Sequence, residues 1–207
     1  MTTGRHDEAE PEPAPAPRPD IVVRPAEAGD FDAWMDVFEQ VAAEGKWIGT
    51  ELPIDRDARQ AGFERTLADD NAVNLLAVDR ASVDRASASP SGEGEGEGEG
   101  QVVGHLFLAV AAYGVADLGM AILEQYRGRG VGSLLMAAGI EFARDHGAHK
   151  IALQLWPHNA GAQALYEKFG FEVEGRLRRH LPRRNGELWD AVVMGLVLDH
   201  DRPGSPY

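Results

Sequence analysis

The chain has 207 residues, of which 43% are hydrophobic and 26% charged, and its formal net charge is −14. This length and balance are typical of one globular domain, and the strong negative charge disfavours nonspecific binding to nucleic acid or to an anionic membrane. The absence of cysteine excludes disulfides, cysteine ligands to zinc and a thiol nucleophile, and it fits a reducing cytoplasm.

The two ends and one internal stretch have the composition of unfolded chain. Residues 1–20 contain PEPAPAPRP, with too few large apolar side chains to offset the entropy cost of ordering, so we expect a disordered tail without a signal-peptide core. Residues 81–100 end in GEGEGEGEG, which predicts a mobile loop inserted in a hairpin. With a short tail at 200–207, one domain over 21–199 remains. A two-domain arrangement would require residues 21–80 to build their own core.

Hydrophobic spacing predicts the secondary structure of this domain. It indicates, in chain order, a strand at 21–24, helices at 30–44 and 54–67, strands at 73–78, 102–111 and 115–123, a helix at 130–146, a strand at 150–155, a helix at 159–169, and strands at 171–177 and 188–198. Asp30 and Asp55 are candidate N-caps of the first two helices, and Gly147 is a candidate stop after the third. No apolar run reaches the roughly eighteen residues of a membrane-spanning helix. The order predicts a mixed sheet with helices on its faces.

A glycine-rich run, Arg127-Gly128-Arg129-Gly130-Val131-Gly132-Ser133, joins a predicted strand to an amphipathic helix. Glycines allow close backbone approach to a ligand, and the first amides of a helix lack intrahelical partners, so the run predicts a cradle for phosphate or pyrophosphate. A P-loop would require Gly-Lys-Ser/Thr, and a dinucleotide-binding turn would require Gly-x-Gly-x-x-Gly. Neither pattern is present.

The spacing Arg-x-x-Gly-x-Gly over residues 127–132 resembles the GNAT superfamily of acetyl-CoA-dependent N-acetyltransferases. A second block, Asn159 followed by Ala-Leu-Tyr-Glu-Lys-Phe-Gly-Phe at 164–171, is similar to the other signature of that family. The resemblance covers about residues 20–198 and is strongest over 101–198. It implies an α/β fold with a central, mostly antiparallel sheet, helices on both faces, and a splayed strand pair that opens a slot for the pantetheine arm.

The resemblance also implies which residues hold acetyl-CoA. The backbone of Ile122 and Leu123 would pair with pantetheine, and Asn159 would hydrogen-bond near its end. The pyrophosphate would contact the Arg127 side chain and the loop amides, which belong to Gly128, Arg129, Gly130, Val131, Gly132 and Ser133. No metal is expected.

For catalysis the resemblance implies that Tyr166 protonates the departing thiolate, while a base takes a proton from the acceptor ammonium. Asp117 is the candidate base, and Glu124 is a poorer one because it adjoins the phosphate loop. The same residues have plainer interpretations: Tyr166 as core, Asp117 as a polar residue at a strand start, and Asn159 as a helix cap. Direct attack of the amine on the thioester needs no cysteine.

The acceptor would be recognised by the N-terminal part, where Trp47 offers an aromatic wall and Glu51 a carboxylate for an ammonium group. Alternatively, Trp47 covers a helix junction and Glu51 is solvated. We expect acetylation of a primary amine of a small molecule, an amino acid or a related amine, because the last strand resembles that of bacterial amino-acid acetyltransferases. Protein N-terminal or lysine acetylation is the second hypothesis, and a CoA-binding sensor without turnover is the third.

Residues 127–190 carry ten Lys and Arg against seven Asp and Glu, so this segment is positive inside an acidic protein. Its densest part, residues 176–184, is compatible with nucleic acid, but the acidic remainder favours a strand-edge loop near the CoA 3′-phosphate or an acidic acceptor. His146 and His149 have a spacing that suggests a metal, yet Gly147 breaks the helix between them; His158 is a candidate wall of the slot. We therefore expect no nucleic-acid or membrane partner, and a homodimer by family habit.

Overall fold

The computed structural model describes residues 20–81 and 100–198. The predicted disordered tail, most of the Gly/Glu loop and the C-terminal tail lie outside these residues. The described elements follow the predicted order: β1 (Ile21–Pro25), α1 (Phe31–Ala43), α2 (Arg56–Leu67), β2 (Ala72–Asp79), β3 (Gln101–Val110), β4 (Val115–Ile122), α4 (Val131–Asp145), β5 (Lys150–Leu155), α5 (Ala160–Lys168), β6 (Glu172–Pro182) and β7 (Leu188–Val197). None of the helices in this described part is long and apolar enough to cross a membrane.

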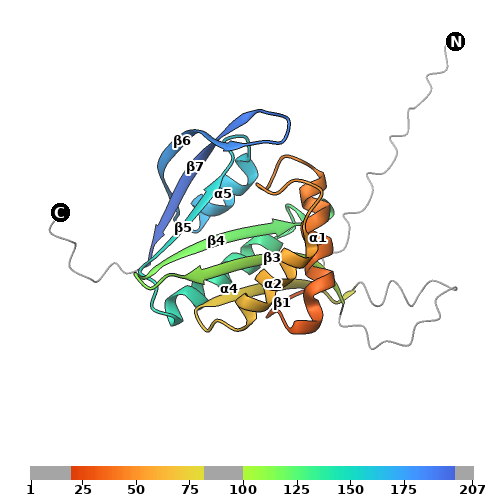
Figure 1. Ribbon diagram of the computed structural model, residues 1–207. Helices are drawn as coiled ribbons and strands as arrows, with labels where there is room; N and C mark the ends of the chain where they lie inside the picture. Colours follow the sequence, from red (N-terminus) through yellow and green to blue (C-terminus); the bar gives the residue numbers. More distant parts are fainter. Residues whose placement is uncertain (1–19, 82–99, 199–207) are drawn as a thin grey trace, which may run out of the picture.

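The seven strands form one sheet in the order β1-β2-β3-β4-β5-β7-β6, and every neighbouring pair is antiparallel except β4 and β5. Helices cover both faces, as Figure 1 shows. Two adjacent residues of β3 illustrate this, because successive side chains of a strand point to opposite faces. His105 packs against Trp34 of α1, whereas Leu106 lies so close to Gly139 of α4 that a Cβ added there would be 3.1 Å from it. The predicted mixed sheet between helices is confirmed.

The parallel pair parts after a short contact. β4 and β5 are paired only where residues 115–117 meet residues 150–152, whereas β4 remains paired to β3 up to Ile122. The Val115 carbonyl accepts the Ala111 N–H, and the Leu123 N–H donates to the Val103 carbonyl. The odd-numbered residues of this stretch therefore direct their backbone groups toward β3. By alternation, the backbone groups of Leu118, Met120 and Ile122 point the other way, toward β5, and beyond the last pair, Asp117 with Ala152, they face the gap. The predicted splayed strand pair is therefore confirmed (Figure 1).

Two helix caps follow the prediction and a third does not. The side chain of Asp55 accepts the Ala58 N–H at 3.0 Å, and a capping bond also starts α5. Asp30 precedes α1, but its backbone already has helical dihedrals at the end of a 3₁₀ turn, so its side chain makes no cap bond. Its carboxylate instead accepts hydrogen bonds from Arg24 and from the Glu27 N–H, and the Arg24 bond lowers the pKa of Asp30. Asp30 thus ties β1 to the turn before α1.

The basic segment 176–184 is largely strand, where a loop was expected. β6 continues to Pro182 because it pairs with β7 along most of its length, with register shifts in the pairing and a left-handed residue, Arg179 at φ +50°. Most of its side chains are exposed, since β6 is an edge strand with β7 as its one neighbour. An edge strand with solvent on both sides shows no alternation of apolar and polar residues, which is why its charges resemble a loop.

Candidate active site

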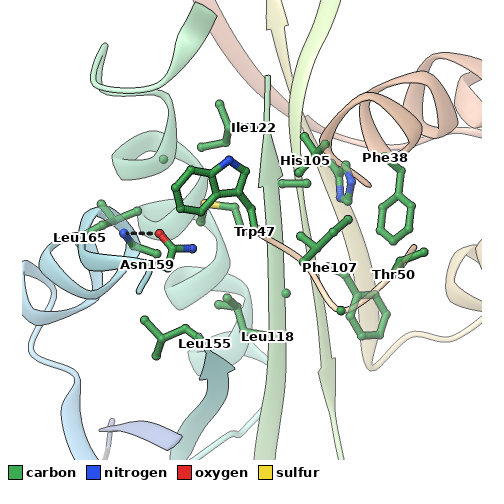
Figure 2. A pocket seen from close by; sticks show the side chains of 18 of the residues that line it. Phe38, Trp47, Thr50, His105, Phe107, Leu118, Ile122, Leu155, Asn159 and Leu165 are labelled. Carbon is green, nitrogen blue, oxygen red and sulfur yellow. Dashed lines mark hydrogen bonds between the residues drawn. The ribbon is translucent and has the colours of Figure 1, made fainter. Parts of the chain in front are cut away.

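One large cavity, with a volume of about 1740 Å³, occupies the gap between β4 and β5. Figure 2 shows side chains from both walls: Leu118 and Ile122 from β4, Leu155 from β5, and Asn159 and Leu165 at α5. The lining extends in one direction to the glycine loop that precedes α4. In the other it reaches the sheet face beneath α1 and α2. A ligand that spans the sheet therefore has a continuous path.

The glycine loop has a shape that only glycine adopts easily. Gly128 and Gly130 have φ values of +71° and +90°, in the left-handed region that disfavours residues with a Cβ. A Cβ at Gly132 would lie 2.8 Å from Leu165 and 3.2 Å from Ile122, so this glycine permits α4 to approach the slot closely. The loop delivers the N-terminus of the fifteen-residue α4 to the cavity, where the helix dipole favours an anion.

Of the predicted pair, Ile122 directs its backbone toward the slot and Leu123 directs its N–H toward β3. Leu123 is buried and donates its N–H to Val103, while the carbonyl of Ile122 accepts the Arg127 Nε at 2.9 Å. The last parallel pair, Asp117 with Ala152, uses the Leu118 N–H, so the open groups are the C=O of Leu118, the N–H and C=O of Met120 and the N–H of Ile122, all on residues that line the cavity. These groups can form hydrogen bonds with the amides of an extended ligand arm, as they would with a neighbouring strand.

Tyr166 and Asn159 line the same cavity from α5. The Asn159 side chain accepts the Ala162 N–H at 3.2 Å, so it caps the helix and lines the slot together. Tyr166 is only 7% exposed and packs 5.7 Å from the Phe171 ring, so its core interpretation holds as well. Burial raises the pKa of its phenol to about 12. The phenol is thus a neutral hydrogen-bond donor at the cavity wall throughout the physiological pH range.

Comparison with known proteins agrees with this geometry. The sequence model of the acetyltransferase (GNAT) family matches residues 79–171. The chain is 31% identical over 183 residues to the L-amino acid N-acetyltransferase AaaT of Escherichia coli, an alignment that covers 86% of this chain and 98% of that protein. The chain belongs to the GNAT acetyltransferase family. It is an N-acetyltransferase, and this family uses acetyl-CoA.

Other GNAT relatives extend the comparison. The chain is 27% identical over 180 residues to the L-methionine sulfoximine/L-methionine sulfone acetyltransferase of Pseudomonas aeruginosa, covering 87% of this chain and 96% of that protein. The crystal structure of a GNAT superfamily phosphinothricin acetyltransferase from Sinorhizobium meliloti in complex with AcCoA superposes with a TM-score of 0.72 at 16% identity, covering 90% of this chain and 93% of that one. That structure shares the fold.

In this GNAT protein Arg127, a predicted pyrophosphate ligand, has an internal partner. Its guanidinium donates to both carboxylate oxygens of Glu44, one at 2.7 Å, and lies 5.5 Å from the ring of Trp47. Trp47, the candidate aromatic wall, lines the cavity and also donates its indole N–H to Glu44. The bonds from Arg127 and Trp47 lower the pKa of Glu44, with the Arg127 bond the larger cause. A phosphate that takes up the Arg127 guanidinium must compete with Glu44.

Asp117, the predicted base, is exposed and does not line the cavity, but it lies near one end of it. Its partner in the β3–β4 pairing is Ala109 of β3, which does line the cavity. Gly119, two residues along β4, also lines it and shares a face of the sheet with Asp117. A carboxylate in this place can reach the cavity through water.

Glu51, the predicted partner of an ammonium group, faces the β6–β7 hairpin and does not line the cavity. Its carboxylate accepts the Arg184 N–H at 2.9 Å and lies 3.4 Å from the Arg183 guanidinium. Arg183 is 5% exposed, donates to backbone carbonyls of residues 45, 48 and 49, and stacks 4.3 Å from Trp189. These arginines hold the α1–α2 segment against the hairpin.

The histidines differ in their placement. His158, a candidate wall of the slot, lines the cavity, with its Nε2 2.7 Å from the Lys46 carbonyl. His146 stacks on Phe142 at the exposed end of α4. No group of three or more His, Asp or Glu side chains positioned for a metal occurs within residues 20–81 and 100–198.

Among the lining residues that were not predicted from the sequence are Arg59, Asn74, His105 and Lys168. Lys168 lies 3.4 Å from the Ser133 hydroxyl, beside the start of α4, and adds positive charge where a phosphate would bind. Its signal was present in the Ala-Leu-Tyr-Glu-Lys block. The other three come from α2, β2 and β3, and no local pattern connects them.

Replacement of Gly130 by alanine is expected to weaken acetyl-CoA binding about tenfold, because a Cβ strains the left-handed turn by roughly 1–2 kcal/mol. Arg127→Ala is expected to weaken it as well, by removing a positive charge from the cavity. Titration calorimetry with acetyl-CoA measures both. Arg144→Ala, an equal charge change at the exposed far end of α4, is the control. Unchanged affinity in both cavity variants would contradict the placement of the cosubstrate.

Proposed function

We propose that this protein transfers the acetyl group of acetyl-CoA to the primary amine of an amino acid or a related small molecule, by direct attack within a ternary complex. The observation that carries the proposal is the single cavity that joins the start of α4, the β4–β5 slot with Tyr166, and the sheet face beneath α1 and α2. Donor and acceptor can then meet from opposite sides. The names of the relatives, an L-amino acid N-acetyltransferase and a methionine sulfoximine acetyltransferase, support this acceptor class.

In the proposed reaction the acceptor nitrogen attacks the thioester carbonyl carbon. A C–N bond forms, the C–S bond breaks, and the electron pair leaves with sulfur. The attacking nitrogen loses its second proton through water to the thiolate, so that the products are the amide and the free thiol of CoA. Asp117 takes the proton of the acceptor ammonium through water before the attack. Because both reactants are held in one cavity, orientation supplies much of the acceleration.

Tyr166 acts on the departing sulfur in this scheme. A thiol ordinarily has a pKa of about 8.5, whereas that of the buried phenol is about 12. Complete proton transfer from phenol to thiolate is therefore uphill, and the main contribution of Tyr166 is a hydrogen bond donated to the developing negative charge. This sharpens the role of acid that the family resemblance implies.

The acceptor class is tested by acetyl-CoA turnover, followed as free thiol release, against amino acids, polyamines, aminoglycosides and peptides. We expect acceptor-dependent release with at least one amino acid. Release with peptides alone would replace the proposal by protein acetylation. An absence of acceptor-dependent release with every compound would favour a CoA-binding sensor.

Tyr166→Phe is expected to retain acetyl-CoA affinity, since the ring still fills its place, but to lower kcat by about 10²–10³-fold, the cost of removing one donor to a developing anion. Stopped assays of kcat alongside calorimetry separate the two effects. Wild-type activity should show no loss from ionisation of Tyr166 up to pH 10, because the raised pKa keeps the phenol protonated. Unchanged turnover of the variant would eliminate Tyr166 from the mechanism.

Asp117→Asn is expected to lower kcat/KM by roughly 10²-fold at neutral pH. The deficit should shrink as the pH approaches the pKa of the acceptor amine, because a neutral amine needs no base. The pH profiles of kcat/KM for the variant and the wild type provide the test. Asp145→Asn, an equal charge change at the end of α4, should match the wild type. A deficit that is constant with pH would indicate a structural role for Asp117.

A further inference from the structure

Arg59 of α2 lines the cavity beneath the helices, on the acceptor side of the slot. It is half-buried, with its guanidinium 4.5 Å from the Phe38 ring and one Nη donating to the Thr50 hydroxyl at 2.8 Å. Loss of hydration lowers its pKa. Figure 2 shows Phe38 and Thr50 on this side of the cavity, across from Asn159.

Among the described residues Arg59 has no carboxylate partner, unlike Arg56, Arg127 and Arg183; Arg65, which also lines the cavity, is exposed to solvent, whereas Arg59 is half-buried. Arg56, one turn earlier on α2, pairs with Asp32 and Glu39. Arg127 and Arg183 likewise pair with carboxylates. A half-buried guanidinium that faces a cavity without a paired carboxylate is suited to bind an anion from outside.

Two buried polar side chains in the same lining also lack partners. Asn74 is 2% exposed and its side-chain oxygen accepts no hydrogen bond; His105 is 3% exposed and neither ring nitrogen has a partner. Burial, with a smaller contribution from the charge of Arg59, lowers the pKa of His105 to about 3, so its ring is neutral. Buried polar groups are normally hydrogen-bonded, so unpaired atoms that line a cavity indicate a polar ligand.

A row of paired residues across the sheet connects Asn74 with the slot. Asn74 on β2 lies opposite Phe107 on β3, which lies opposite Gly119 on β4, at the edge of the splayed strands. An added Cβ at Gly119 would meet no atom within 4 Å, so this position leaves open space beside the slot. A ligand held at Arg59 can thus extend over this row toward the thioester.

We propose that Arg59 binds the carboxylate of the acceptor, with Asn74 as a neighbouring polar contact, and thereby selects α-amino acids over amines without a carboxylate. This rests on the proposed function. The guanidinium presents a planar fork that matches a carboxylate, and its charge is not neutralised by another residue of the cavity wall. The amino group of the acceptor then points along the row toward Gly119.

The test compares an amino acid with its primary amide, which differ in the charge of one group. For the amino acid with the highest kcat/KM, we expect Arg59→Met to lower kcat/KM by about 10- to 100-fold, the value of a hydrogen-bonded charged contact, and to leave the amide within threefold of wild type. Arg59→Lys, which keeps the charge without the fork, should fall between. Arg56→Met removes a charge from the same helix outside the cavity and should preserve the wild-type preference. Melting temperatures and acetyl-CoA affinity confirm that each variant is folded.

Binding without turnover separates this inference from the proposed function. In the presence of CoA, calorimetry with leucine and leucinamide should show tighter binding of the acid by wild type and loss of that preference in Arg59→Met. An equal effect of Arg59→Met on acid and amide, or no preference for the acid in wild type, would overturn the inference even if amines are acetylated. Failure of every acceptor in the turnover assay, with the binding preference intact, would overturn the proposed function alone.

Discussion

The separation of β4 from β5 is the constraint on which the site depends. The two strands share hydrogen bonds only between residues 115–117 and 150–152, and they then diverge while each stays paired to its other neighbour. Backbone groups left unpaired inside a protein are costly, so a gap of this kind persists where a ligand can satisfy them. The large apolar side chains buried on both faces of the sheet, among them Leu76, Leu106 and Ile151, hold the strands in this arrangement.

The segment between α1 and α2 spans the gap and is held on both of its sides. Glu44 binds Arg127 on the β4 side, and the Lys46 carbonyl contacts His158 on the β5 side. The buried Arg183 fastens the same segment to the β6–β7 hairpin through backbone carbonyls. Positive charge in this acidic protein is therefore used largely for internal connections. Among the positive groups that remain available to a ligand at the cavity are the start of α4, Lys168, Arg59 and the more exposed Arg65.

Patterns local in the chain were interpreted correctly where a single physical rule dominated. The caps at Asp55 and Asn159 and the order of strands and helices all follow from short-range spacing. The errors occurred where long-range contacts prevailed. Asp30 accepts hydrogen bonds from Arg24 instead of capping a helix. β6 continues through a run of charges because β7 supplies its hydrogen bonds.

The sequence by itself determined the family, the glycine loop and the residues of α5 that line the slot, because each depends on neighbours within about ten positions. Only the tertiary structure decided which polar groups are open to a ligand. It showed that Glu51 and Arg183 are engaged with each other, that β4 has open backbone groups from the Leu118 carbonyl onward, and that Arg59 faces the cavity without a paired carboxylate. The physical reason is that the availability of a polar group depends on whether another group, distant in the chain, already satisfies it.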